Sequence, residues 1–261
     1  MAAERASVHR VLVVLDTASE AAHLLEAASA LAAGMRTSLA ALFVEDERLM
    51  QAAALPFASE LGVASAQVRP LAPIAIERAL RAQAAQMRRV LEAAASRFSL
   101  SWSLEIERGR TLPVALARLC STELLVFGAS GMAAAARARV REPSAASSVQ
   151  ARTFGAVYDG TPKGDRALAA ACAAAAAAGA SLVAFVVANG QRADGEALQR
   201  YSEGSGVAIK RIDIPGGDVD AIAGATRGAG VDVLFVPGAD GGELRVGALL
   251  AVVSCPLVLV P

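Results

Sequence analysis

The stretch VLVVLDTASE, residues 11–20, decides how this chain is organised. An apolar run stops at Asp16, and Thr17 and Glu20 then have the S/T-x-x-E spacing of a helix capping box. An apolar strand that leads directly into a capped helix is the first step of a βα unit. The helix should end near Gly34, and the apolar run SLAALFV after it predicts a second strand, parallel to the first.

The same unit is written a second time, 143 positions later. FGAVYDGTP aligns with VLVVLDTAS, so that Asp159 stands in the place of Asp16. Thr161 and Pro162 supply an N-cap residue followed by a proline, which is favoured at the first helical position. The run SLVAFVV, after Gly179, predicts the strand that follows. The repeat therefore predicts two βαβ units in one chain.

A third and a fourth strand are expected in each unit. LSWSLEIE, residues 100–107, alternates apolar and polar side chains, which predicts a strand at the edge of a sheet. LLVF and VLFV are short apolar runs that predict the fourth strands. With the third strand outermost, the expected fold is α/β, with two open parallel-sheet units of strand order 3-2-1-4-5 at residues 1–150 and 151–261.

Two segments interrupt this plan. Residues 45–73 are mostly without a counterpart in the second unit, and their mixed sequence predicts a lid-like helix–turn insertion. Residues 141–152, which begin REPSAASS, have the composition of a flexible connector. No long apolar run lies just before this connector, so the first unit is expected to lack its fifth strand or to have it reduced. The second unit keeps a closing strand at residues 256–261.

The candidate ligand residues lie where strands of each unit end. In an open α/β sheet, ligands bind beyond the carboxyl ends of the strands, where neighbouring helices leave in opposite directions. The candidates are Asp16, Val44, Gly128 and Gly131 in the first unit, and Asp159, Gly238 and Gly241 in the second. Each aspartate either accepts from a ligand or holds the turn before its helix, and each glycine pair either cradles a phosphate or only turns the chain.

Composition argues against several classes of protein. The 25 cationic side chains are balanced by 25 acidic ones, so the cationic surplus that nucleic-acid binding needs is absent. No segment has the bulk and the length of about 20 residues that a membrane span needs, and the N-terminus lacks a signal-peptide cleavage pattern. The three cysteines and two histidines lack the spacing of a disulfide frame or a zinc site. We therefore expect a cytoplasmic protein without nucleic-acid or membrane partners.

These features together resemble a tandem universal stress protein of the UspA-like family. The residues that carry the resemblance are the strands ending in Asp, VLVVLDTAS and AVYDGTPKGDRAL, the segment ALFVEDERLMQAAALPFASELG, the corners GASG and GADG, and the terminal CPLVLVP. Some members bind ATP through the Asp after the first strand and a Gly-x2-Gly-x9-Gly-Ser/Thr loop after the fourth. Members often dimerise, commonly through the last strand.

The second part of that nucleotide loop is missing in both units. Where the family pattern has Gly followed by Ser or Thr, this chain has Arg141 and Glu142, and then Ala251 and Val252. The missing pair would supply a helix N-terminus for the outer phosphates, and Glu142 would repel them. ATP binding is therefore expected to be weak or lost, and no cofactor is assigned beyond ATP or AMP as a candidate.

The resemblance implies a stress-response or regulatory protein that acts by association, as a homodimer or with another protein. No nucleophile–base pair, paired carboxylates or metal cluster is visible in the sequence, so an enzyme is not expected. If the first unit lacks its fifth strand, a second copy of the chain could complete the pairing. The alternative is an ATP-binding signalling module that uses Asp16 and Gly128–Gly131 in the first unit.

Overall fold

The computed structural model describes residues 10–15, 21–61, 66–119, 123–128, 152–187, 195–238 and 242–261. The strands are β1 (Arg10–Leu15), β2 (Ser38–Asp46), β3 (Ser59–Leu61), β4 (Val68–Pro70), β5 (Trp102–Gly109), β6 (Glu123–Phe127), β7 (Thr153–Tyr158), β8 (Ser181–Val187), β9 (Ile209–Ile214), β10 (Val233–Pro237) and β11 (Leu257–Val260). The helices are α1 (Ala21–Gly34), α2 (Glu47–Ala53), α3 (Pro73–Arg97), α4 (Thr111–Ala117), α6 (Pro162–Ala178), α7 (Gly195–Ser205), α8 (Val219–Gly228) and α9 (Gly242–Val252), with a 3-10 turn at Pro215–Gly217. None of these helices has both the length and the hydropathy to cross a membrane.

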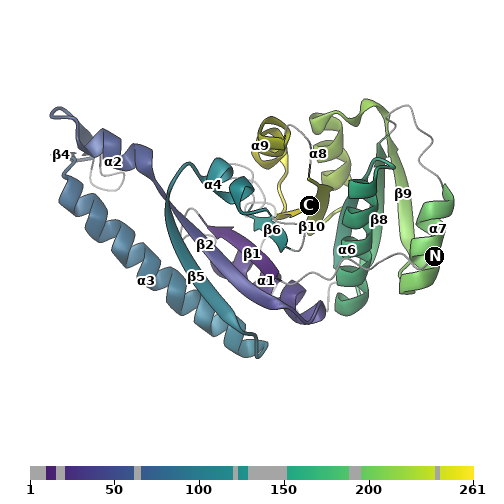
Figure 1. Ribbon diagram of the computed structural model, residues 1–261. Helices are drawn as coiled ribbons and strands as arrows, with labels where there is room; N and C mark the ends of the chain where they lie inside the picture. The colour runs from purple at the N-terminus through teal and green to yellow at the C-terminus, as the bar shows by residue number, and fades with distance from the viewer. Residues whose placement is uncertain are drawn as a thin grey trace.

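The described strands other than β3 and β4 form one nine-stranded sheet with helices on both faces (Figure 1). Its strand order is β5-β2-β1-β6-β11-β10-β7-β8-β9. All neighbours are parallel except β11 and β6, which are antiparallel. The α/β class with a mostly parallel sheet is therefore confirmed. β5 lies at one edge, as its alternating sequence predicts.

The two expected open-sheet units are not independent sheets, because β11 joins them into one. Leu257 pairs with Leu234 of β10 on one side and with Phe127 of β6 on the other. The four side chains of β11 are apolar and buried, which suits a strand in the middle of a sheet. A buried strand must also pair its backbone groups on both sides, and β11 does so with one strand from each half of the chain.

The strand position beside β6 is therefore filled by the second half. The reasoning that a second copy would complete the first unit loses its basis, because β11 already pairs with β6. The sequence between Gly128 and Arg152, which includes nearly all of the expected connector at residues 141–152, lies outside the described residues.

Helices α1 and α6 bring the two halves together on one face of the sheet (Figure 1). Gly34, the last residue of α1, lies against Ala177 of α6, and a Cβ atom at Gly34 would stand 2.6 Å from the Cβ of Ala177. The two residues are 143 positions apart and so occupy equivalent places in the repeat. Small side chains on both helices permit this close approach. The alanine tract of α6 is thus a helix-packing surface.

At two neighbouring core positions, the second half has one smaller and one larger side chain than the first half. Gly155 of β7 stands where β1 has Leu12, and Phe185 of β8 stands where β2 has Leu42. A Cβ atom at Gly155 would lie 2.9 Å from Cε2 of Phe185. The ring therefore occupies the space that a larger side chain would fill, and the core keeps its packing density.

The insertion at residues 45–73 forms helix α2 and the hairpin β3–β4 at one end of the molecule (Figure 1). The helical part is confirmed, whereas the rest is a two-stranded antiparallel sheet and not only a turn. Asp46 caps α2 by accepting a hydrogen bond of 3.0 Å from the backbone N–H of Arg48. The Arg48 side chain also bonds the carboxylate and lowers the pKa of Asp46. We call residues 47–74 the arm.

Candidate ligand pocket

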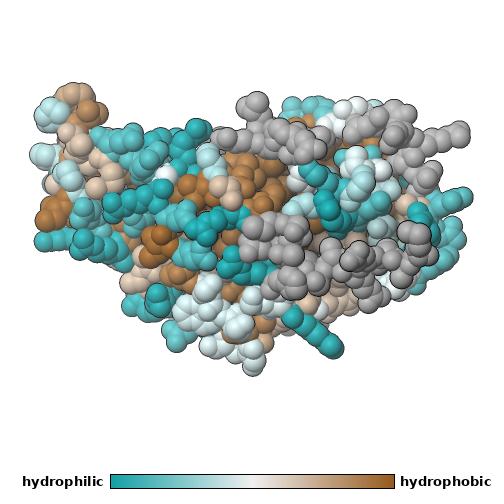
Figure 2. Space-filling model, viewed as in Figure 1, coloured by the Kyte–Doolittle hydropathy of each residue, from teal (hydrophilic) through white to brown (hydrophobic). Residues whose placement is uncertain are grey.

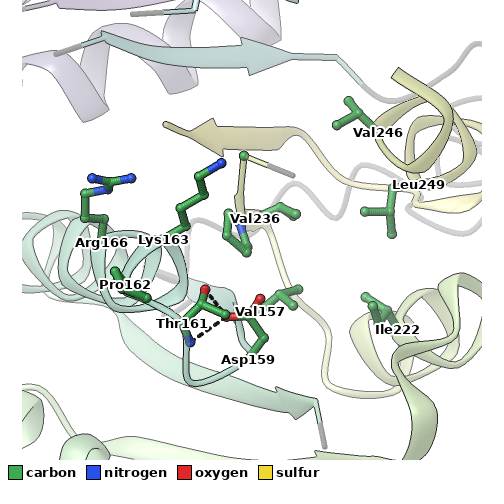
Figure 3. Close-up of a pocket in the computed structure, with 12 residues that line it drawn as sticks. Val157, Asp159, Thr161, Pro162, Lys163, Arg166, Ile222, Val236, Val246 and Leu249 are labelled. Atoms are coloured by element: carbon green, nitrogen blue, oxygen red, sulfur yellow. Dashed lines mark hydrogen bonds between the residues drawn. The ribbon is translucent and has the colours of Figure 1, made fainter. Parts of the chain in front are cut away.

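A cavity of about 480 Å³ lies at the carboxyl ends of β7 and β10, which are neighbours in the sheet (Figure 3). Helix α6, which follows β7, packs on one face of the sheet, and α9, which follows β10, packs on the other. This is the crevice in which open α/β sheets bind ligands. Two of the predicted residues, Asp159 and Gly238, line it.

The cavity has an apolar part and a polar part. The apolar side chains are Val157, Ile222, Val236, Val246 and Leu249, and the polar ones are Asp159, Thr161, Lys163 and Arg166. Figure 3 shows the two cationic residues on the α6 side and Ile222, Val246 and Leu249 across the cavity from them. Apolar walls with a few convergent polar groups are typical of small-molecule sites.

Asp159 and Thr161 form a tightly bonded turn at the start of α6. Oδ1 of Asp159 accepts from the Thr161 hydroxyl at 2.7 Å and from the Thr161 backbone N–H at 3.1 Å. The Thr161 hydroxyl oxygen in turn accepts from the Gly164 N–H at 3.1 Å and caps the helix. A side chain at Gly164 would collide with Oδ1 of Asp159. Of the two roles predicted for Asp159, holding the turn is therefore confirmed for Oδ1.

The second oxygen of Asp159 is placed differently. Within the described ranges, Oδ2 has no hydrogen bond, and the residue is half-buried at the cavity. An ionised carboxylate accepts only, through about four lone-pair sites. Oδ2 is therefore suited to accept from a hydroxyl or an amino group of a ligand.

Lys163 and Arg166 supply the positive charge of the pocket. They stand three residues apart in the first turns of α6 and therefore share one face of the helix. Lys163 is half-buried and Arg166 is exposed, and both line the cavity. Together with the positive end of the α6 dipole, they favour an anion here. Sequence reasoning did not select these residues, although the spacing in TPKGDR directly after a predicted N-cap was a usable signal.

Gly238 does not present a phosphate cradle. Its backbone N–H donates to the carbonyl oxygen of Val260 at 2.6 Å and so continues the pairing of β10 with β11. A Cβ atom at Gly238 would lie 3.1 Å from the same oxygen, so the close approach of the C-terminal strand favours glycine. Gly238 is therefore a packing and pairing residue, while Gly241 lies outside the described residues.

In the second half, the residues that replace the Gly-Ser/Thr part of the nucleotide loop belong to helix α9. Helix α9 begins at Gly242, directly after the glycine corner. Ala251 and Val252, which stand where the family pattern has Gly followed by Ser or Thr, are the last two residues of that helix. They lie at its carboxyl end, where the dipole repels an anion.

In the first half, the predicted site is only partly visible. Asp16 and Gly131 lie outside the described residues. Gly128 follows β6 against α1, and a Cβ atom there would stand 3.3 Å from Cδ2 of Leu24. Val44 is 1% exposed, and its side chain belongs to the core. The first-half site remains a prediction. No group of three metal-ligating side chains is present in the part of the chain that the structure describes.

Comparison with known proteins finds solved structures of similar fold. No model of a protein family matches the sequence, and no curated protein matches it significantly. A universal stress protein from Archaeoglobus fulgidus DSM 4304 superposes with a TM-score of 0.58 and covers 97% of this chain and 96% of its own, at 12% identity. The chain has the universal stress protein fold. At this identity, the likeness establishes the fold alone.

Further universal stress structures match less closely. A putative universal stress protein from Pseudomonas aeruginosa UCBPP-PA14 covers 99% of this chain and 95% of its own, with 11% identity and a TM-score of 0.49. A universal stress protein solved in complex with cAMP covers 42% of this chain and 96% of its own, with 22% identity and a TM-score of 0.37. Our assignment of the universal stress fold rests on the first structure.

Proposed function

We propose that this chain is a tandem UspA-like stress-response protein, with units at residues 1–150 and 151–261, that regulates by association and binds a nucleoside monophosphate in its second half. The observation that carries the proposal is the cavity beyond β7 and β10, with apolar walls facing Lys163 and Arg166. The universal stress fold supports the assignment to a regulatory protein. We propose that the protein catalyses no reaction.

The parts of a nucleoside monophosphate match the parts of the pocket. Pro162 and Pro237 line the cavity and are not buried, so they offer an apolar surface for a base. Oδ2 of Asp159 is an acceptor for a ribose hydroxyl or an exocyclic amino group. Lys163 and Arg166 pair with a single phosphate. The volume of about 480 Å³ lies in the range of small-molecule sites, roughly 300–1,000 Å³.

A triphosphate fits the same residues less well. Outer phosphates are usually held by free backbone N–H groups at a glycine loop and a helix N-terminus. The N–H of Gly238 is already bonded to Val260. Ala251 and Val252 stand at the wrong end of α9 to supply such groups. We therefore propose that ATP binds more weakly than AMP.

Ligand titration tests this proposal. AMP at about 100 times its dissociation constant should stabilise the chain by about 2.7 kcal/mol, measured by thermal or urea unfolding. Lys163→Ala and Arg166→Ala, which each remove a cation from the cavity, should weaken this stabilisation, and the double variant should abolish it. Lys210→Ala is the matched control, since Lys210 is exposed on β9 and does not line the cavity.

Two outcomes would contradict the proposal. The first is the absence of stabilisation by AMP in the wild-type chain at millimolar concentration. The second is stabilisation by ATP that survives Lys163→Ala and disappears in Asp16→Ala, which would locate the nucleotide in the first half and support the signalling-module alternative. Isothermal titration calorimetry on the same variants gives the stoichiometry directly.

A further inference from the structure

The arm exposes large apolar side chains that the described fold does not cover. Phe57, Leu61 and Val68 are 78%, 64% and 69% exposed. With Leu55 and Ile74, which are also exposed, they form what we call the arm patch. Figure 2 shows hydrophobic atoms at this end of the molecule. Scattered apolar residues on a surface are ordinary, but several large ones on one small segment mark an interaction site.

The β3–β4 hairpin has one largely apolar face and one charged face, and both are exposed. Leu61 pairs directly with Val68, and Ser59 with Pro70, so these four side chains share one face. All six residues of β3 and β4 are exposed, so this largely apolar face is open to solvent. The charged pair Glu60 and Arg69 stands on the opposite face.

An isolated hairpin of this kind needs a covering layer. Two-stranded hairpins are marginally stable in water unless one face packs against something. A sheet buries its apolar face against another sheet or a helix, and two sheets pack face to face at about 10 Å. A second hairpin of the same kind supplies such a layer.

The charges of the arm favour a copy of the same chain as the covering partner. The arm patch contains no ionisable side chain, so pressing two patches together desolvates no charge. The nearby charges are paired or face away from the patch: Arg48 is ion-paired with Asp46, and Glu60 and Arg69 stand on the other face of the hairpin. In a two-fold contact, each surface meets itself in reverse, so an uncharged apolar patch meets an equal patch without like-charge repulsion. A lipid surface would favour a cationic flank, which the arm lacks.

We propose that the arm patch is a dimer contact, in which the β3–β4 hairpin packs against the same hairpin of a second copy. This inference names a surface for the association proposed above and does not depend on the ligand pocket. It also moves the expected dimer contact away from the last strand, which already pairs on both sides within the chain.

Light scattering after size-exclusion chromatography, and analytical ultracentrifugation, test the proposal on the full chain. The wild-type protein should have twice the mass of the chain. The double variant Phe57→Ser/Leu61→Ser should raise the dissociation constant of the dimer by about a hundredfold. Both positions are exposed, so the melting temperature of the monomer should change little.

The matched control is Ile106→Ser. Ile106 is an exposed apolar residue, 48% exposed, on strand β5 outside the arm. This variant should dimerise like the wild type, and so should the pocket variant Lys163→Ala. A failure of the ligand proposal would thus leave this result unchanged.

Three outcomes would overturn the proposal. One is a wild-type chain that stays monomeric at about 100 μM, above the dissociation constants of standard interfaces. Another is a dimer that persists unchanged in Phe57→Ser/Leu61→Ser. The third is a monomeric wild type that sediments with phosphatidylcholine or phosphatidylserine vesicles and loses this binding in the double variant, which would assign the arm patch to a lipid surface.

Discussion

The two halves of the chain are alike where they touch and different where they face solvent. At their contact, Gly34 of α1 lies against Ala177 of α6, and these two residues occupy equivalent positions in the repeat. Away from this contact, the first half carries an exposed apolar arm, and the second half carries a cavity lined by Lys163 and Arg166. A close contact between two helices restricts both contacting residues, whereas exposed segments that pack against nothing change without that restriction.

The comparison extends to single core positions. Gly155 and Phe185 replace the Leu12 and Leu42 of the first half, so that a lost side chain is matched by a larger ring. Cys172 replaces Ser29, and both side chains are buried in equivalent helices. Each pair is a difference between the two repeats. Its effect on the free energy of unfolding can be measured by placing the residue of one half at the equivalent position of the other.

The largest effect is expected from restoring leucine in the second half. Gly155→Leu places a side chain where the Phe185 ring lies 2.9 Å from the Cβ position, so it should destabilise the fold by about 3 kcal/mol through overpacking. Phe185→Leu alone should cost about 1.5 kcal/mol through the cavity it leaves. The double variant should be more stable than Gly155→Leu, as measured by urea unfolding. Strictly additive effects would show that the two positions do not share space.

A smaller effect is expected at the contact between the halves. Gly34→Ala adds a Cβ atom 2.6 Å from that of Ala177 and should cost about 1–2 kcal/mol by forcing α1 and α6 apart. Gly34→Ala combined with Ala177→Gly exchanges the two residues across the contact and should recover most of the loss. Thermal unfolding of the three variants checks this. Equal stability of Gly34→Ala and wild type would mean that the helices separate without cost.

Ser29 and Cys172 allow a test in the stabilising direction. The Ser29 hydroxyl is fully buried and has no hydrogen-bond partner within the described residues. Ser29→Ala should therefore raise the free energy of unfolding by about 1 kcal/mol. The matched change Cys172→Ser should alter it less, because Ser205, which bonds the Cys172 thiol, is a partner for the new hydroxyl. A destabilised Ser29→Ala would reveal a partner for the hydroxyl.

The effect that is smallest near neutral pH, and grows only at high pH, concerns the ionisation of Cys172. Burial raises the pKa of its thiol from 9.0 to about 11, although a hydrogen bond with Ser205 opposes the shift. Between these values the folded chain keeps a proton that the unfolded chain loses, so stability should be constant below pH 9.0 and fall towards pH 11. Cys172→Ala should lack this contribution to the fall in urea unfolding curves.

The same pKa predicts the chemical reactivity of Cys172. In native protein at about pH 8, iodoacetamide should leave Cys172 unmodified, because the thiolate is the reactive form. In urea, peptide mapping should find the same residue alkylated. Rapid modification of the native chain would contradict both the burial and the raised pKa.

Local sequence was sufficient to predict the individual strands and helices of the βαβ units. The Asp after β7, the Thr161 cap and the apolar runs of the βαβ units are features of residues close together in the chain, and they predicted strands and helices correctly. The edge position of β5 followed from its alternation. The general place of the pocket followed from a rule about strand ends that does not depend on side-chain detail.

Only the tertiary structure decided how these elements combine. That β11 serves both halves depends on which strand edges meet, and its four apolar residues do not encode the partner on either side. The role of Gly238 depended on a carbonyl from the far end of the chain, at Val260. Lys163 and Arg166 became pocket residues because α6 and α9 face each other across the end of the sheet. The hydrophobic pattern of the sequence determines which face of a helix or strand is apolar. Only tertiary packing decides whether that face is covered, and in this structure the arm patch is not covered.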